Sequence, residues 1–161
     1  MNTILRRRTA MRGGGGGFDW EDFATKLIER KLNDTYVLPS SITTVGSRAF
    51  AQAASTNLFS LELPSSVTSI ANDAFNSAQS LINITIPASV TSIGNNAFAY
   101  CSRLATMIML GSTPPTITSS ALGATTLTYG IYVPNDAVNT YKTAQYWSSY
   151  ASRIFSIKDL P

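Results

Sequence analysis

Short stretches of alternating hydrophobic and polar residues recur along the chain, and each stretch ends at a proline. Residues 60–63 read SLEL and residues 83–86 read NITI, so every second side chain is hydrophobic. This alternation is typical of a strand that buries one face. Pro64 and Pro87 follow directly, and proline has no backbone N–H to donate to a neighbouring strand. The pattern therefore predicts short strands with one buried and one exposed face.

These strands belong to a repeat of about two dozen residues. Residues 36–50 (YVLPSSITTVGSRAF), 61–75 (LELPSSVTSIANDAF) and 84–98 (ITIPASVTSIGNNAF) align with steps of 25 and 23 residues. A fourth strand is predicted over residues 104–109 (LATMIM), and a degenerate fifth begins at residues 131–134 (IYVP). A repeat of this length predicts a solenoid in which successive coils stack and their strands form a parallel sheet.

The interior of each coil is indicated by residues that occupy the same place in the repeat. Phe50, Phe75 and Phe98 coincide, and we expect their rings to stack as a column inside the solenoid. Gly46 and Gly94 also coincide, and we expect each to form a turn with a positive φ, which glycine adopts without steric cost.

The strings LPSSVTSIANDAF and IPASVTSIGNNAFAYC resemble the BspA-like leucine-rich repeat. That family's unit runs from a strand through Ile-Pro, Ser-Val-Thr-Ser-Ile-Gly and two variable residues to Ala-Phe, and Cys101 stands at the family's cysteine position. The resemblance implies a right-handed leucine-rich-repeat solenoid, β-rich and of the α/β class, with adhesive or scaffolding roles. Many members are bacterial surface proteins that contact host proteins, and others occur in phage particles. Residues 131–154 resemble the closing segment of such proteins.

An open solenoid needs a cap at each end. Residues 1–17 read as a flexible basic arm, 18–33 as an amphipathic capping helix, 34–112 as the repeats and 113–161 as a C-terminal capping segment. In the first cap, Trp20, Phe23 and Leu27 fall at helical spacing. This helix could instead dock onto a partner.

The C-terminal capping segment is predicted to contain a second helix over residues 136–144. Its Val138 and Tyr141 should face inward. Four further side chains should then seal the last coil: Trp147, Tyr150, Ile154 and Phe155.

Composition argues against catalysis and metal binding. The chain has 161 residues, of which 44% are hydrophobic and 13% charged, and it has no histidine. Its one cysteine, Cys101, has no partner for an internal disulfide and is expected in the core. Glu62 and Asp73 are isolated carboxylates rather than a catalytic pair. We therefore predict that the protein is not an enzyme and uses no metal or cofactor.

The positive charge is concentrated at the N-terminus. Four of the twelve basic residues lie in the first 17 positions with no acid among them. Arg6, Arg7, Arg8 and Arg12 could dock into an acidic groove of a neighbouring protein, or could remain a free tail. No aromatic residues are interleaved with them, so specific nucleic-acid binding is not indicated. The sequence shows no apolar run of membrane-spanning length and no secretory signal after the arginines.

The strand face that points away from the core is the candidate binding surface. One column of this face holds Thr35, Ser60, Asn83 and Thr106, and the next holds Val37, Glu62, Thr85 and Ile108. These columns contain no aromatic anchor, so an ordinary solvated face is the alternative. The candidate partner-binding residues are Arg6, Arg7, Arg8, Arg12, Thr35, Ser60, Glu62, Asn83, Thr85 and Thr106.

Two functional hypotheses follow from these features. The first is a structural component of a phage virion, anchored by the basic arm and projecting the solenoid. The second is a bacterial surface protein that, like an adhesin, binds a host protein or glycan. In both, the chain is a non-enzymatic module that contacts a protein partner or a larger assembly.

Overall fold

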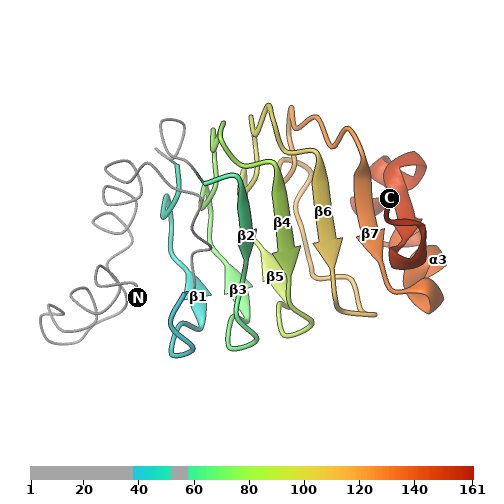
Figure 1. Ribbon diagram of the computed structural model, residues 1–161, viewed down its shortest axis with the longest axis horizontal. Coiled ribbons are helices and arrows are strands. Elements are labelled where there is room, and N and C mark those ends of the chain that lie inside the picture. Colours follow the sequence, from blue (N-terminus) through green and yellow to red (C-terminus); the bar gives the residue numbers. More distant parts are fainter. Residues whose placement is uncertain (1–37, 52–57) are drawn as a thin grey trace, which may run out of the picture.

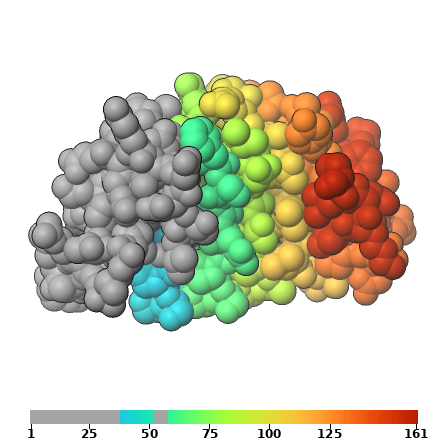
Figure 2. Space-filling view, in the orientation of Figure 1, coloured from blue at the N-terminus to red at the C-terminus, as the bar shows by residue number. Residues whose placement is uncertain are grey.

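The computed structural model describes residues 38–51 and 58–161. The basic arm, the predicted capping helix at 18–33, Thr35 and Val37 therefore lie outside the described residues. Within the described part, successive coils lie side by side in chain order, and the C-terminal helices stand at one end (Figure 1). In the space-filling view the coils form adjoining bands that follow the sequence (Figure 2).

Among the described residues the larger sheet has five parallel strands. These are β2 (Ser60–Glu62), β4 (Asn83–Ile86), β6 (Thr106–Met109), β7 (Gly130–Val133) and β8 (Ile154–Ser156). Each strand pairs with the strand of the next coil in the register of the repeat, so that Leu61 lies opposite Ile84 and Ile84 opposite Met107. The strands predicted around residues 60–63, 83–86, 104–109 and 131–134 and their parallel arrangement are confirmed, whereas the strand predicted before Pro39 falls largely outside the described residues. β8 extends the sheet beyond the last strand that the repeat predicts.

A second, three-stranded sheet forms on the return stretch of each coil. It comprises β1 (Thr44–Val45), β3 (Ser69–Ile70) and β5 (Ser92–Ile93), again all parallel. A threonine ladder runs beside it, in which Thr68, Thr91 and Thr116 each donate both the backbone N–H and the hydroxyl to the carbonyl of the preceding threonine. These bonds join the coils on the side away from the five-stranded sheet.

The phenylalanine column is present as predicted. The ring centroids of Phe50 and Phe75 are 4.8 Å apart, and those of Phe75 and Phe98 are 4.9 Å apart. In each pair the planes of the two rings differ by 5°, so the rings are stacked. Each phenylalanine N–H also donates to an alanine carbonyl of the next coil, as Phe75 does to Ala97 at 2.7 Å. Burial of one such side chain stabilises the fold by about 2–3 kcal/mol.

The prediction for the two repeat glycines is wrong. Neither Gly46 nor Gly94 has a positive φ; Arg48, Asp73 and Asn96 adopt it instead, two residues further along. Gly94 is required for a different reason, because a Cβ atom there would lie 2.6 Å from the backbone nitrogen of Asn72 in the preceding coil. The coils therefore approach one another too closely at this point for any side chain.

The C-terminal capping segment contains four short helices: η2 (Asn135–Ala137), α3 (Val138–Thr143), η3 (Trp147–Arg153) and η4 (Ile157–Asp159). The predicted inward positions of Val138 and Tyr141 are confirmed. The Tyr141 hydroxyl donates to the Gly111 carbonyl at 2.8 Å, and the Trp147 indole N–H donates to that of Pro115 at 2.8 Å. The two aromatic rings thus cover the last coil while their polar atoms satisfy backbone carbonyls that lie beneath the cap.

One of the four predicted sealing residues departs from this arrangement. Trp147 and Ile154 are buried and Tyr150 packs partly against the core, but the side chain of Phe155 is 38% exposed. Phe155 alternates with Ile154 and Ser156 along β8, so its ring is directed to the outer side of the sheet.

Candidate functional site

The candidate site is the side of the five-stranded sheet that faces away from the core, which we call the outer face. The register places its residues in two rows that cross the strands. The first row is Ser60, Asn83, Thr106 and Gly130, and the second is Glu62, Thr85, Ile108, Tyr132 and Phe155. The predicted columns are therefore confirmed from β2 to β6, and β7 and β8 continue them.

The part of the outer face on β2 and β4 is polar. Ser60, Glu62 and Asn83 are exposed, and Thr85 is half-buried. Of these side chains Glu62 carries a charge, whereas the hydroxyls and the amide can both donate and accept hydrogen bonds. This part of the surface can therefore hold a polar partner without selecting strongly for charge.

Thr106 was expected to be exposed on this face, and this expectation is wrong. Its side chain is 7% exposed. Thr106 stands in the middle of the sheet, paired with Asn83 on one side and with Gly130 on the other. A side chain with so little exposed surface is unsuited to contact a partner.

An aromatic pair lies at the other end of the outer face. The rings of Tyr132 and Phe155 have centroids 5.8 Å apart and are inclined by 39°. The Tyr132 side chain is 6% exposed, and its hydroxyl donates to the Tyr129 carbonyl at 3.1 Å. Tyr132 is thus fixed in place and supports the more exposed ring of Phe155. Side chains of this kind dominate the energetics of interfaces.

Gly130 provides the space into which the Phe155 ring fits. A Cβ atom on Gly130 would lie 2.7 and 2.8 Å from two carbons of that ring, Cε2 and Cδ2. The φ of Gly130 is +113°, a value that other residues rarely adopt. The repeat pattern missed this site, because neither Gly130 nor Phe155 belongs to the recurring motif. Tyr132 could have been found by extending the second column into residues 131–134.

Arg153 fastens the cap to the loop that precedes the aromatic pair. Its guanidinium donates from Nη1 to the carbonyls of Leu127 and Thr128 at 3.3 and 3.2 Å. The exposed ring of Tyr129 follows directly. The aromatic end of the outer face is therefore supported from both β7 and the helix that leads into β8.

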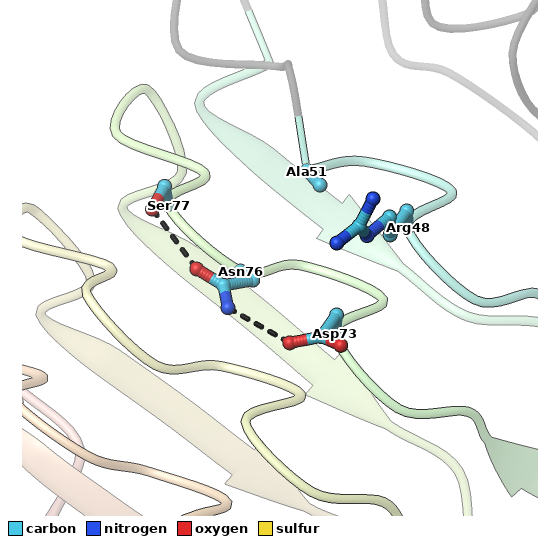
Figure 3. A pocket seen from close by; sticks show the side chains of 5 residues that line it. All are labelled: Arg48, Ala51, Asp73, Asn76 and Ser77. Atoms are coloured by element: carbon cyan, nitrogen blue, oxygen red, sulfur yellow. Dashed lines mark hydrogen bonds between the residues drawn. The ribbon is translucent and has the colours of Figure 1, made fainter.

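A small polar pocket lies at the turn edge of the coils, apart from the outer face. It has a volume of about 260 Å³ and is lined by Arg48, Ala51, Asp73, Asn76 and Ser77 (Figure 3). Asn76 Nδ2 donates to Asp73 Oδ1 at 2.9 Å, and the Ser77 hydroxyl donates to Asn76 Oδ1 at 2.9 Å. These bonds join residues of one turn, so they account for its local shape without a ligand.

Cys101 is a core residue, as predicted. The thiol is fully buried and donates to the Phe75 carbonyl at 3.1 Å. Burial raises the pKa of the Cys101 thiol to about 12. A hydrogen bond with the backbone of Ala78 lowers this pKa, but its effect is smaller than that of burial. The reactive thiolate is therefore scarce near neutral pH.

Two negative findings concern only the part of the chain that the structure describes. No group of three or more His, Cys, Asp or Glu side chains is placed to hold a metal ion there. No helix among residues 38–51 and 58–161 has both the length and the apolar character needed to cross a membrane. The predicted roles of Arg6, Arg7, Arg8, Arg12 and Thr35 lie outside these residues and stay predictions.

Comparison with known families decides the identity of the repeat. Residues 29–151 match the BspA type leucine rich repeat region in six copies. The chain belongs to this family. The match covers the phenylalanine column, the three-stranded sheet and the strands β2, β4, β6 and β7 of the five-stranded sheet, and it ends within the C-terminal capping segment, before β8. A comparison with curated proteins gave no match.

Proposed function

We propose that this BspA-type repeat protein is a non-enzymatic interaction module that binds its partner through the outer face. The observation that carries the proposal is the Phe155 ring, which stays partly exposed although Gly130 and Tyr132 hold it in position. A fixed aromatic side chain loses little conformational freedom on binding, so more of its contact energy contributes to affinity.

The remainder of the outer face supports the same proposal. Ser60, Glu62 and Asn83 extend away from the aromatic pair as exposed hydrogen-bonding groups. An apolar contact combined with nearby hydrogen-bonding groups is a usual composition of a binding surface. Family membership favours an adhesin-like role for such a surface.

The chemistry of the described residues supports a binding role over catalysis. The chain has no histidine, and burial keeps the Cys101 thiol protonated. Glu62 lies on the outer face and Asp73 at the turn edge, where its carboxylate accepts a hydrogen bond from Asn76. These groups lack the arrangement of a base beside a nucleophile that covalent catalysis requires.

The virion hypothesis depends on the basic arm at residues 1–17, and no feature of the described residues favours it. It stays a prediction, and deletion of residues 1–17 tests it: loss of incorporation into phage particles supports it, and normal incorporation contradicts it. An adhesin-like role depends instead on the outer face and can be examined with the intact chain.

A matched pair of charge substitutions tests the outer face. Asn83→Lys places a bulky charge on β4, and Thr43→Lys places the same charge on an exposed position beside β1, in the other sheet. We expect binding of the intact chain to purified host-surface glycoproteins, measured by surface plasmon resonance, to be lost in Asn83→Lys and kept in Thr43→Lys. Equal binding by both variants would contradict the proposal.

A further inference from the structure

The shape of the aromatic end of the outer face indicates what kind of ligand it receives. Two carbons on one edge of the Phe155 ring lie beside the position that a Cβ atom of Gly130 would occupy. The ring therefore leans over the backbone of β7 and does not project from the sheet. A leaning ring offers a flat apolar surface for stacking, whereas an aromatic anchor of a protein interface typically inserts into a pocket of the partner.

The hydrogen-bonding side chains that β4 adds to the outer face are neutral. Asn83 and Thr85 offer an amide and a hydroxyl, and the phenol of Tyr132 is already bonded to the Tyr129 carbonyl. The charged groups lie at the two ends of the face: Glu62 is on β2, and Arg153 precedes β8, where its guanidinium already donates to the carbonyls of Leu127 and Thr128. A neutral ligand rich in hydroxyl groups would pair with such a surface without leaving a charge unpaired.

The spacing of the strands matches a linear chain that crosses them. Adjacent strands lie about 4.8 Å apart, close to the length of one sugar ring in an extended chain. Asn83 is two strand steps from Gly130, over which the Phe155 ring lies. One sugar could therefore stack on Phe155 while the second following sugar reaches the Asn83 amide.

From these observations we propose that the outer face binds a neutral linear glycan, stacked on Phe155 and hydrogen-bonded by Asn83. This inference rests on the proposed function, because it names the ligand of the same surface. It assigns Phe155 the apolar contact with the C–H groups of one sugar ring. Asn83, with Thr85 beside it, contributes the polar contacts that set the position of the chain.

Titration of the intact chain with three neutral pentasaccharides tests the proposal: cellopentaose, maltopentaose and chitopentaose. We expect at least one to bind in isothermal titration calorimetry, with upfield shifts of its C–H protons that report stacking on an aromatic ring. Phe155→Ala should weaken this binding at least about tenfold, which corresponds to about 1.4 kcal/mol. Phe155→Trp should keep it, because a ring is retained.

Two further variants separate a loss of the site from a loss of the fold. Asn83→Ala should weaken binding, and Thr43→Ala, beside the other sheet, should not. All variants should still unfold in one cooperative thermal transition, which Phe155→Ala lowers without leaving the chain unfolded at the temperature of the titration. The proposal is overturned if none of the three pentasaccharides binds, or if Phe155→Ala binds as tightly as the parent.

A comparison of native and enzymatically deglycosylated host-surface glycoproteins distinguishes this proposal from the proposed function. Binding that is lost on removal of the sugars supports the glycan ligand. Binding that persists on the deglycosylated protein and still depends on Phe155 overturns the glycan ligand and leaves the outer face as a protein-binding surface. Binding that is independent of Phe155 in both forms overturns both.

Discussion

The ring of Phe155 occupies the space that a side chain on Gly130 would fill, since a Cβ atom on Gly130 would come within 2.7 Å of Phe155 Cε2. These two residues are on neighbouring strands of the five-stranded sheet, although 25 positions separate them in the sequence. The contact fixes the orientation of the Phe155 ring, which is the more exposed ring of the aromatic pair. It also joins the capping segment to the sheet.

Gly130→Ala should therefore disturb both the fold and the outer face. The substitution adds a Cβ atom where there is no room and places alanine at a φ of +113°. A residue held in such a region costs about 1–3 kcal/mol. We expect urea unfolding to show a loss of at least this size. Gly123→Ala is the control, because its Cβ would approach no atom closer than 3.3 Å. Equal stability of the Gly130→Ala variant and the parent would contradict the proposed contact.

Phe75→Ala tests the phenylalanine column. Phe75 stacks on Phe50 and Phe98, so its removal leaves a hole between two rings that their backbone hydrogen bonds hold in place. Truncation of a buried phenylalanine costs about 3–5 kcal/mol. Chemical denaturation should show this loss, and the partly exposed Phe155→Ala should lose distinctly less. A loss below about 1 kcal/mol for Phe75→Ala would mean that the stack is not the core of the fold.

Tyr141→Phe tests the C-terminal cap. The change removes a hydroxyl that donates to the Gly111 carbonyl and leaves this acceptor without its partner beneath the cap. Such a loss costs about 1–3 kcal/mol. The exposed Tyr100→Phe removes a hydroxyl at the surface and should leave stability unchanged. Thermal unfolding of the two variants would show the difference, and equal transitions would count against the proposed role of Tyr141.

The buried thiol of Cys101 predicts a loss of stability at high pH. Burial raises its pKa from 9.0 to about 12, so between these values the unfolded chain releases a proton that the folded chain retains. The stability contributed by the protonated thiol is complete below pH 9.0 and is lost as the pH rises towards 12. The slope is at most about 1.4 kcal/mol per pH unit.

Comparison with Cys101→Ala isolates this effect from the tyrosines. Burial also raises the pKa values of Tyr141 and Tyr150, which therefore contribute in the same direction. The parent should lose stability more steeply than the variant when urea unfolding is measured from pH 8 to about pH 11. Parallel curves would show that the thiol ionises as readily in the folded chain as in the unfolded one.

The sequence was sufficient for the repeating part of the fold. Phe50, Phe75 and Phe98 recur at one place in the repeat, and a side chain that recurs in a solenoid meets its equivalent in the next coil. The alternation in residues 60–63 and 83–86 likewise identified the strands and the side that faces outward. The strands of the second sheet, such as Ser69–Ile70, are two residues long and too short for any alternation to appear.

The features that the sequence did not reveal depend on contacts between unlike segments. Gly94 recurs with Gly46, but recurrence alone does not distinguish a turn from a close approach to Asn72. The aromatic end of the outer face requires Gly130, Tyr132 and Phe155 to be brought together by the pairing of β7 with β8. Neither strand is followed by the full repeat motif, so the alignment gave no register for β8.

Amide chemical-shift mapping by NMR tests the central claim most directly, because it reports where on the intact chain a ligand binds. The ligand should be the pentasaccharide that binds most tightly or, if none binds, the deglycosylated glycoprotein that does. We predict shifts confined to the outer face, at residues 83–85, 106–108, 130–132 and 155. Shifts that instead cluster on the three-stranded sheet, or around Arg48 and Asp73 at the turn edge, would contradict the claim that the outer face is the binding surface.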